Sequence, residues 1–287
     1  MTMTPSPLIS TAELADLLDR PDLHIVDGSL RMIDASWHLD GRNGQSEFDQ
    51  VRLPGAVFFD LEAVSDRSSD LPHMLPSPAD FAAAVGAMGI GQDDTIVVYD
   101  SVGLFSAARV WWTFRLMGAR DVRVLDGGLP KWRAEGREVE TGPAPTPAPA
   151  IFTPTFVSDG VADLSMVLSA LTGDAQILDA RPAARFTGQT PEPRPGLRSG
   201  HMPGALNVPM KSVLDEAGLL KRGEALDAVF RTAGIDPDRP IITTCGSGVT
   251  AAVLTLALAE LGRDSVLYDG SWAEWGGRSD TPVAVAA

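Results

Sequence analysis

The amino-acid sequence predicts an α/β protein built from two tandem domains, each a parallel sheet flanked by helices. Three observations lead to this prediction: the chain has 287 residues, short β-rich runs alternate with helical patterns, and one set of landmarks occurs twice. A chain of this length exceeds one average domain and can form two hydrophobic cores. Strands that alternate with helices are typical of a parallel sheet covered on both faces.

The repeated landmarks come in the same order in both halves of the chain. Each half has a short apolar strand that ends in aspartate, a Pro-Gly-Ala turn, a second apolar strand, and an Asp-Gly turn followed by a tryptophan. The second copy follows the first at a nearly constant distance, which indicates tandem duplication. The pairs are residues 24–27 and 176–179, 54–56 and 203–205, 95–99 and 241–244, and 125–128 and 268–271, with Trp132 and Trp275.

Start signals support the predicted helices. Ser10 and Glu13 form a capping-box pattern at the start of the first helix. Ser77, followed by a proline at the first helical position, predicts a helix over residues 78–88. A long apolar helix should follow the second apolar strand of the C-terminal half, over residues 249–261.

A proline-rich segment separates the two halves. Residues 142–155 read GPAPTPAPAIFTPT, and prolines remove backbone donors and favour an extended path. We therefore expect an N-terminal domain at 1–141, a linker at 142–155 and a C-terminal domain at 156–287.

Charge and cysteine content exclude several classes of function. With 23 Lys+Arg against 38 Asp+Glu the formal charge is −15, which disfavours nucleic-acid and anionic-membrane surfaces. One cysteine cannot form an intramolecular disulfide or a cysteine zinc cluster. No stretch approaches the about 18 apolar residues of a membrane span, and no signal peptide is recognisable. We expect a cytoplasmic protein without a metal or cofactor.

The single cysteine stands where the second apolar strand of the C-terminal half ends. Cys245 is followed by Gly246, Ser247 and Gly248 before the predicted helix. The glycines permit a tight loop with positive φ, and the amide groups of the loop and the helix dipole can stabilise a thiolate. A lone cysteine elsewhere is usually a small buried apolar residue, but at a strand-to-helix loop between glycines we interpret Cys245 as a nucleophile.

The surrounding residues narrow the chemistry of this thiolate. A cysteine phosphatase needs an arginine six residues after the cysteine, where this chain has Ala251. None of the four histidines stands in a recognisable Cys-His signature of a protease or acyl transferase. A thioredoxin-like redox role needs a second cysteine. The remaining hypothesis is attack on sulfur that leaves a persulfide on Cys245.

The duplicated α/β pattern and the cysteine loop resemble the rhodanese superfamily, and within it the 3-mercaptopyruvate sulfurtransferases. The resemblance runs from about residue 23 to residue 278. In this family the first domain is catalytically silent, and here Asp100 stands at the position of Cys245. The motifs that carry the resemblance are Cys-Gly-Ser-Gly-Val-Thr-Ala at 245–251, residues 101–114 with Trp111-Trp112, Leu-Asp-Gly-Gly at 125–128, Pro-Glu-Pro-Arg at 191–194 and Tyr-Asp-Gly-Ser-Trp at 268–272.

The resemblance also implies a substrate and the residues that bind it. Thiosulfate-using members place basic residues directly after the cysteine, whereas this chain has Gly246 and Ser247. That favours 3-mercaptopyruvate, whose keto-acid end the family holds with two arginines that match Arg185 and Arg194. A guanidinium suits this role because it pairs bidentately with a carboxylate. The alternatives are a thiosulfate sulfurtransferase and a non-catalytic module that binds or carries sulfur.

The remaining roles also follow from the resemblance. Ser247 matches a family serine in a proton relay with a carboxylate of the first domain, for which Glu62 and its neighbour Asp60 are the candidates. His73 matches a family histidine near that relay, or caps a backbone group of its loop. The expected acceptor is a thiol such as thioredoxin, or cyanide in an assay. The amides that would cradle the persulfide are those of Gly246, Ser247, Gly248, Val249 and Thr250.

Overall fold

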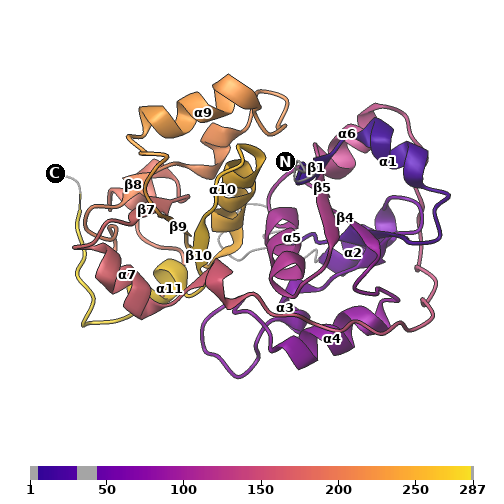
Figure 1. Ribbon diagram of the computed structural model, residues 1–287, viewed down its shortest axis with the longest axis horizontal. Helices are drawn as coiled ribbons and strands as arrows, with labels where there is room; N and C mark the ends of the chain where they lie inside the picture. Colours follow the sequence, from indigo (N-terminus) through magenta and orange to yellow (C-terminus); the bar gives the residue numbers. More distant parts are fainter. Residues whose placement is uncertain (1–5, 31–43, 286–287) are drawn as a thin grey trace. The chain divides into compact units, whose positions relative to one another are not determined.

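The computed structural model describes residues 6–30 and 44–285, which form two compact units (Figure 1). Of these residues, unit 1 holds those up to Arg67 together with Leu75–Val157 and Ala217–Leu219. Unit 2 holds Ser68–Met74, Ser158–Glu216 and the residues from Leu220 onward. The short segment 68–74 thus belongs to the unit that also contains the cysteine loop.

The described strands of unit 1 form one parallel five-stranded sheet in the order β1-β5-β4-β2-β3. Its central strand β4 is buried at every position, as expected for a parallel sheet covered on both faces. The strands are β1 (Leu8–Ile9), β2 (Leu23–Asp27), β3 (Val57–Phe58), β4 (Thr95–Tyr99) and β5 (Asp121–Leu125).

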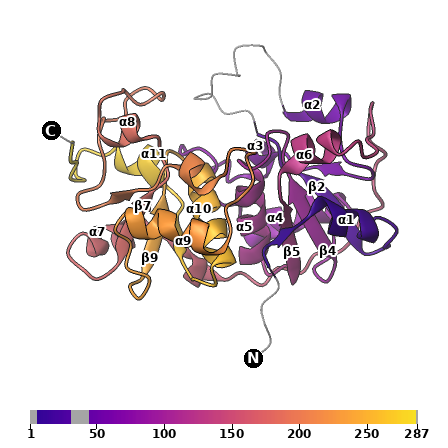
Figure 2. The ribbon, with the colours of Figure 1, turned by 90° about the horizontal axis from the view of Figure 1, so that it is seen from above.

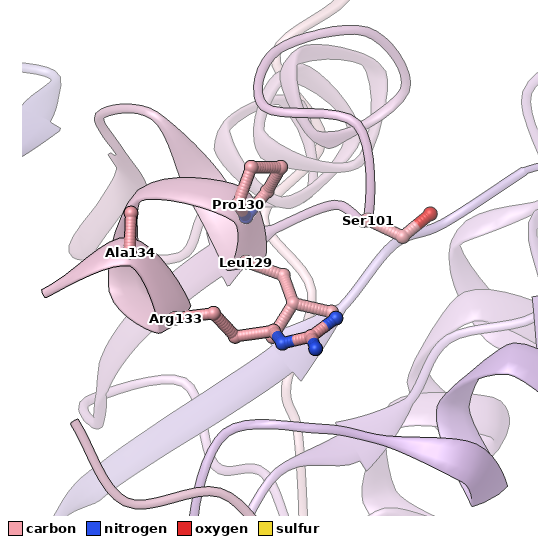
Figure 3. A pocket seen from close by; sticks show the side chains of 5 residues that line it. All are labelled: Ser101, Leu129, Pro130, Arg133 and Ala134. Carbon is pink, nitrogen blue, oxygen red and sulfur yellow. The ribbon is translucent and has the colours of Figure 1, made fainter. Parts of the chain in front are cut away.

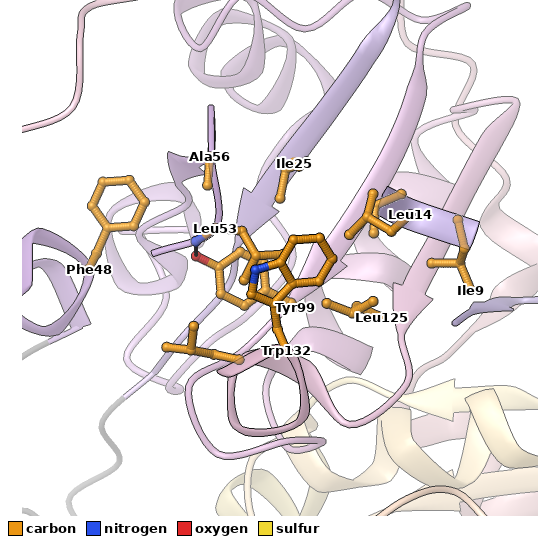
Figure 4. Close-up of a cluster of buried hydrophobic side chains, with 11 residues drawn as sticks. Ile9, Leu14, Ile25, Phe48, Leu53, Ala56, Tyr99, Leu125 and Trp132 are labelled. Atoms are coloured by element: carbon orange, nitrogen blue, oxygen red, sulfur yellow. Dashed lines mark hydrogen bonds between the residues drawn. The ribbon is translucent and has the colours of Figure 1, made fainter. Parts of the chain in front are cut away.

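Helices cover both faces of this sheet. On one face Leu14, Phe48 and Trp132 of α1, α2 and α6 pack against Val97 and Tyr99 of β4 (Figure 4). Val97 and Tyr99 share this face because side chains alternate along a strand. The helices of unit 1 are α1 (Thr11–Leu17), α2 (Gly44–Gln50), α3 (Leu61–Val64), α4 (Pro78–Ala87), α5 (Ala107–Leu116) and α6 (Gly128–Ala134).

A second cluster of aromatic rings includes a residue of the proline-rich segment. The ring of Phe81 in α4 meets Phe114 of α5 and Phe152 edge-on, at centroid distances of 5.1 and 5.5 Å. Phe152 is buried, and the backbone amide of Ala150 donates to Gly86 at 2.9 Å. The proline-rich segment therefore packs on unit 1 along part of its length. The predicted domain limits at 141 and 156 stay a prediction.

Unit 2 repeats this topology. Its described strands form a parallel five-stranded sheet in the order β6-β10-β9-β7-β8, the same order as in unit 1. The strands are β6 (Val161–Ala162), β7 (Gln176–Asp179), β8 (Leu206–Asn207), β9 (Ile241–Thr244) and β10 (Val266–Tyr268). The shared order confirms the predicted α/β fold with two parallel sheets.

The sheet of unit 2 lies between α7 and α11 on one face and α10 on the other (Figures 1 and 2). Val167 of α7 and Trp272 and Trp275 of α11 form a buried cluster with Ile177 and Ile242 of the sheet. Helix α10 is apolar all round and buried along most of its length. The remaining elements are the helices α7 (Leu164–Ala170), α8 (Ala183–Phe186), α9 (Gly223–Thr232), α10 (Val249–Glu260) and α11 (Ser271–Trp275), and the 3₁₀ turns η2 (Ser158–Gly160) and η3 (Met210–Val213).

The predicted start signals are confirmed. The Ser10 hydroxyl accepts from the Glu13 amide while the Glu13 carboxylate accepts from the Ser10 amide, which completes the capping box of α1. Ser77 caps α4, because its hydroxyl accepts from the Asp80 amide at 3.1 Å. In the part of the chain that the structure describes, no helix has the length and apolar character needed to cross a bilayer.

Candidate active site

The thiol of Cys245 lies at the carboxyl end of the central strand of unit 2. Cys245 follows β9 directly and exposes only 2% of its surface, and its thiol is free. Residues 246–248 then lead into α10. Ligands of parallel α/β sheets bind beyond the carboxyl ends of the strands, so this loop has the position of a functional site.

The two glycines of the loop serve different purposes. Gly248 has φ +77° and is the N-cap of α10, a left-handed conformation that glycine adopts without strain. Gly246 is not in that region. A Cβ atom on Gly246 would lie 3.0 Å from Nη2 of Arg185. Glycine at 246 therefore lets a guanidinium group approach the backbone beside the cysteine.

Helix α11 fixes the backbone of the cysteine loop. The amides of Trp272 and Ala273 donate to the carbonyls of Cys245 and Gly246, both at 2.9 Å. The hydroxyl of Ser271 accepts from the Cys245 amide at 3.3 Å and donates to the Tyr268 carbonyl at 2.9 Å. Because the first turn of α11 satisfies the loop carbonyls, the loop is held at its two ends by two different helices.

The hydroxyl of Ser247 is buried, as is that of Thr244 on the other side of the cysteine. Ser247 exposes 1% of its surface, and among the described residues its Oγ has no hydrogen-bond partner. A buried hydroxyl without a partner costs about 1–3 kcal/mol. Such a group two residues from a free thiol is a functional-site signal.

The predicted binding residue Arg185 reaches the loop from α8. Its Nη2 and Nε donate to the Glu192 carboxylate, at 2.5 and 3.3 Å. The side chain of Arg185 is 18% exposed, whereas that of Glu192 is 1% exposed. The structure thus brings Arg185 to the cysteine loop, and a buried carboxylate pairs with it there.

A third arginine, Arg181, belongs to this cluster and was not predicted from the sequence. Its guanidinium pairs with Asp179 at the end of β7, with Nη2 to Oδ2 at 2.6 Å, and with Glu192, with Nη1 to Oε1 at 2.8 Å. It also lies over the Trp272 ring, 4.2 Å from the centroid. Arg181 is 1% exposed. The available signal was the Asp179-Ala-Arg181-Pro sequence directly after a buried strand, because an arginine there is a ready partner for the strand-end aspartate.

His73 and Arg194 lie together in unit 2. Nη2 of Arg194 is 3.5 Å from Nε2 of His73, the outer limit of a hydrogen bond. A guanidinium can only donate, so Nε2 is the acceptor in this contact. His73 is buried and has φ +61°, a region that histidine enters more readily than most residues.

The candidate relay carboxylates belong to unit 1. Asp60 is the N-cap of α3, and its carboxylate accepts from the amides of Glu62 and Ala63, both at 3.1 Å. Glu62 stands in the first turn of α3 and is exposed. Because the Asp60 carboxylate already caps α3, Glu62 is the better candidate of the two for the relay. The relay with Ser247 stays a prediction.

Unit 1 carries a carboxylate where unit 2 carries the thiol. Asp100 follows the central strand β4 and is fully buried, and its carboxylate accepts from the amides of Val102, Phe105 and Ala107 at 3.1, 2.7 and 3.0 Å. Burial raises the pKa of Asp100 above its usual value, and these amide hydrogen bonds offset only part of that rise. A loop at this edge of the sheet can therefore surround an anion with backbone donors.

A shallow pocket lies beside the Asp100 loop (Figure 3). Ser101 and residues of α6 line it, with the Arg133 guanidinium on one side. The expected catalytic silence of the first half stays a prediction. Within residues 6–30 and 44–285, no group of three or more His, Cys, Asp or Glu side chains is placed to hold a metal ion.

Comparisons with known proteins agree with this architecture. A model of the rhodanese-like domain matches residues 10–135 and 165–278. The chain is 48% identical over 272 residues to the 3-mercaptopyruvate sulfurtransferase of Escherichia coli K12, covering 94% of this chain and 95% of that protein. It is 40% identical over 299 residues to thiosulfate/3-mercaptopyruvate sulfurtransferase 1 of Arabidopsis thaliana, covering 96% and 79%.

A solved structure extends the similarity to three dimensions. The crystal structure of SseA from Escherichia coli, described as a 3-mercaptopyruvate sulfotransferase with the rhodanese fold, matches with a TM-score of 0.83 and 45% identity. The match covers 93% of this chain and 99% of SseA. With a rhodanese-like domain matched in each half, the chain belongs to the rhodanese family.

Proposed function

We propose that this protein is a 3-mercaptopyruvate sulfurtransferase and that Cys245 is its nucleophile. The observation that carries the proposal is the guanidinium of Arg185 at Gly246, beside the only cysteine of the chain. The thiol, a soft nucleophile, and the guanidinium, a group that binds carboxylates, therefore lie at the same loop. The 48% identity to the E. coli 3-mercaptopyruvate sulfurtransferase supports the same donor.

The reaction proceeds in two displacements. The Cys245 thiolate attacks the sulfur of 3-mercaptopyruvate, the carbon–sulfur bond breaks, and its electron pair leaves with pyruvate as an enolate that takes up a proton. The new sulfur–sulfur bond leaves a persulfide on Cys245. A thiolate acceptor then attacks the outer sulfur, and Cys245 leaves as a thiolate ready for the next donor.

The anionic sulfur is stabilised by the amides of residues 246–250. Helix α10 has 12 residues, and its N-cap Gly248 has no side chain that could satisfy the first-turn N–H groups. The equivalent loop of unit 1 gives the precedent within the same chain, because its amides of Val102, Phe105 and Ala107 hold the Asp100 carboxylate. A thiolate or persulfide at 245 takes the place of that carboxylate.

Arg185 and Arg194 bind the carboxylate and carbonyl end of the donor. The guanidinium of Arg185 lies against the loop at Gly246, and the guanidinium of Arg194 contacts His73. Planar guanidinium groups suit a keto acid because each can donate two parallel hydrogen bonds. The donor is then held with its sulfur toward the thiol.

Ser247 transfers the proton that the donor sulfur loses or that the enolate takes up. Its buried hydroxyl has no partner among the described residues and stands two residues from the thiol. Glu62, or Asp60 in its place, serves as the carboxylate of the relay, and His73 assists. A catalytic proton donor supplies about 10²–10⁴-fold in rate, so Ser247→Ala should slow pyruvate release without preventing folding.

Intact-protein mass spectrometry tests the nucleophile. After 3-mercaptopyruvate without acceptor, the parent protein should gain the mass of one sulfur atom while pyruvate appears in equal amount. Because the chain has one cysteine, any thiol-bound sulfur is on Cys245. Cys245→Ser should show neither product, and Asp100→Asn, in unit 1, should show both. Substantial pyruvate release by Cys245→Ser would refute the proposal.

A thiosulfate sulfurtransferase is the second candidate. The A. thaliana relative is named for both donors, and the Arg185 guanidinium places a positive charge at a loop that has no basic residue at 246 or 247. Turnover on the two donors under identical conditions decides between them. We expect a clear preference for 3-mercaptopyruvate, and the opposite preference would select the second candidate.

A sulfur carrier or binding module is the third candidate. It predicts a persulfide without catalytic pyruvate release, so the pyruvate measured beside the mass spectrum separates it from the enzyme. We propose a thiol acceptor such as thioredoxin, since a single cysteine leaves no second thiol in the chain. The same solitary cysteine supports a reducing, cytoplasmic compartment.

A further inference from the structure

Glu192 joins two arginines, Arg181 and Arg185, of which Arg185 reaches the cysteine loop. One carboxylate oxygen accepts from Nη1 of Arg181 at 2.8 Å, and the other accepts from Nη2 of Arg185 at 2.5 Å. The Glu192 side chain is 1% exposed. We propose that Glu192 is a positioning residue of the sulfur-transfer reaction that sets the guanidinium of Arg185 against Gly246. The proposal rests on the function assigned above to Cys245 and Arg185.

The side chain of Arg185 needs such a partner. Arg185 projects from α8, a helix of four residues. The backbone of that helix is fixed at its end, because Nδ1 of His201 lies 2.8 Å from the Phe186 carbonyl and the two rings stack. Only the long side chain of Arg185 can still change its conformation, and holding it in one geometry costs about 2 kcal/mol of rotamer entropy. The bond to a buried carboxylate keeps the guanidinium at the loop.

Glu192 can hold Arg185 because Arg181 holds Glu192. Arg181 is bound to Asp179 through Nε and Nη2, and it donates to the Gly200 carbonyl at 2.9 Å. Its guanidinium lies over the ring of Trp272, whose amide holds the Cys245 carbonyl. The same buried network thus packs on the residue that binds the Cys245 carbonyl, and through Glu192 it holds Arg185 near Gly246. Charge-assisted bonds of this kind are about twice as strong as neutral ones.

Two substitutions separate position from charge. Glu192→Asp keeps the charge but shortens the side chain, so one carboxylate cannot span both guanidinium groups. Glu192→Gln keeps the length but removes the charge that makes the bond to Arg185 strong. If Glu192 only neutralised positive charge, Glu192→Gln would bind an anionic donor more tightly, with a lower KM. A positioning role predicts that both variants raise KM.

The experiment measures steady-state kinetics with 3-mercaptopyruvate in four proteins: parent, Glu192→Asp, Arg185→Ala and the double variant. We expect Glu192→Asp to raise KM about tenfold with kcat changed less than about threefold, because Arg185 binds the donor in the ground state and the transition state alike. In the Arg185→Ala background the same substitution should leave KM unchanged, because its target is gone. The thermal midpoint should fall in both backgrounds, since the shorter side chain fits the buried pair with Arg181 less well in each.

The chain offers a matched control for the loss of an ion pair. Glu140 pairs with the buried Arg52 in unit 1, with Oε2 to Nη2 at 3.1 Å. Glu140→Gln should lower the thermal midpoint without raising KM. If Glu192→Gln does not fold, Glu192→Asp and the Arg185→Ala pair still decide the question.

The outcomes distinguish this proposal from the function on which it rests. If the parent protein does not release pyruvate from 3-mercaptopyruvate, the proposed function fails. If the parent is active, an unchanged or lower KM in Glu192→Asp overturns the positioning role. An equal rise of KM in the presence and absence of Arg185 also overturns it, since Glu192 would then act through another group.

Discussion

Asp100 and Cys245 occupy the same place in the two units: each is the residue directly after the central strand of its sheet, at the entrance to a buried helix. In unit 1 the side chain is a carboxylate that three backbone amides bind. In unit 2 it is a free thiol. The same position of the sheet therefore carries a carboxyl group in one unit and a thiol in the other.

Replacing Asp100 should destabilise unit 1. The loss of stability should be larger for a side chain that offers no oxygen to the loop amides than for one that still offers an oxygen. Asp100→Ala leaves the buried amides of Phe105 and Ala107 without the oxygen that both now share, at a cost of about 1–3 kcal/mol. Asp100→Asn keeps an oxygen there and should cost less. Urea unfolding monitored by circular dichroism measures both variants, and the reverse ranking would contradict the role of the carboxylate.

The stability of the protein should depend on pH through Asp27. Burial is the main cause that raises the pKa of this carboxyl from 3.8 to about 6, and the neighbouring Asp100 charge adds to it. The folded protein therefore holds the proton more tightly than the unfolded chain. The resulting stabilisation is present below the unfolded pKa and is lost as pH rises through about 6.

Asp27→Asn tests this dependence. The free energy of unfolding of the parent minus that of the variant should fall between pH 4 and pH 7 by at most about 3 kcal/mol. The exposed Asp93, which pairs with Arg120, provides a control, and Asp93→Asn should leave the pH profile parallel to that of the parent. A constant difference for Asp27→Asn would show that its pKa is not raised.

Gly246→Ala should displace Arg185 without unfolding the protein. The added Cβ would lie 3.0 Å from Nη2 of Arg185, the far end of a flexible side chain that can move. We expect a KM for 3-mercaptopyruvate raised about three- to tenfold and a thermal midpoint close to that of the parent. Gly91→Ala brings a Cβ to 3.1 Å from the Asp94 carboxylate in unit 1 and should change neither. A parent-like KM for Gly246→Ala would argue against the position of Arg185.

His73→Asn should weaken donor binding through Arg194. Asparagine tolerates the φ of +61° at this position but removes the Nε2 atom near the Arg194 guanidinium. KM should rise about two- to fivefold with little change in the thermal midpoint. His73→Val should in addition lose about 1–2 kcal/mol of stability because of its backbone conformation. A lower kcat at an unchanged KM would assign His73 to proton transfer instead.

The fold of each unit could be predicted from local sequence features. Strands β4 and β9 are continuous apolar runs, and the capping residues Ser10 and Ser77 have the same short-range partners in the structure as in the sequence pattern. These features act over a few residues, so the sequence pattern captures them. The internal repeat accounts for the strand order that the two sheets share, because two copies of one sequence pattern adopt one topology.

The environment of the cysteine loop could be predicted only in part. Cys245 at a strand end and Asp100 in its place in unit 1 are visible in the sequence, because each is defined by its neighbours along the chain. Glu192 stood in the motif that indicated Arg194, but no local feature shows that its carboxylate is buried between Arg181 and Arg185.

The sequence by itself determined the two α/β units, the place of the single cysteine at the end of the second central strand, and the aspartate at the matching position of the first unit. The tertiary structure alone decided that Arg185 reaches Gly246 and that His73 lies beside Arg194, which is 121 residues away. Contacts of that kind join segments that are far apart along the chain, so no local sequence pattern records them. Periodicity and capping report which side chains are buried and where helices begin, whereas the partner of a buried charge depends on how the whole unit packs.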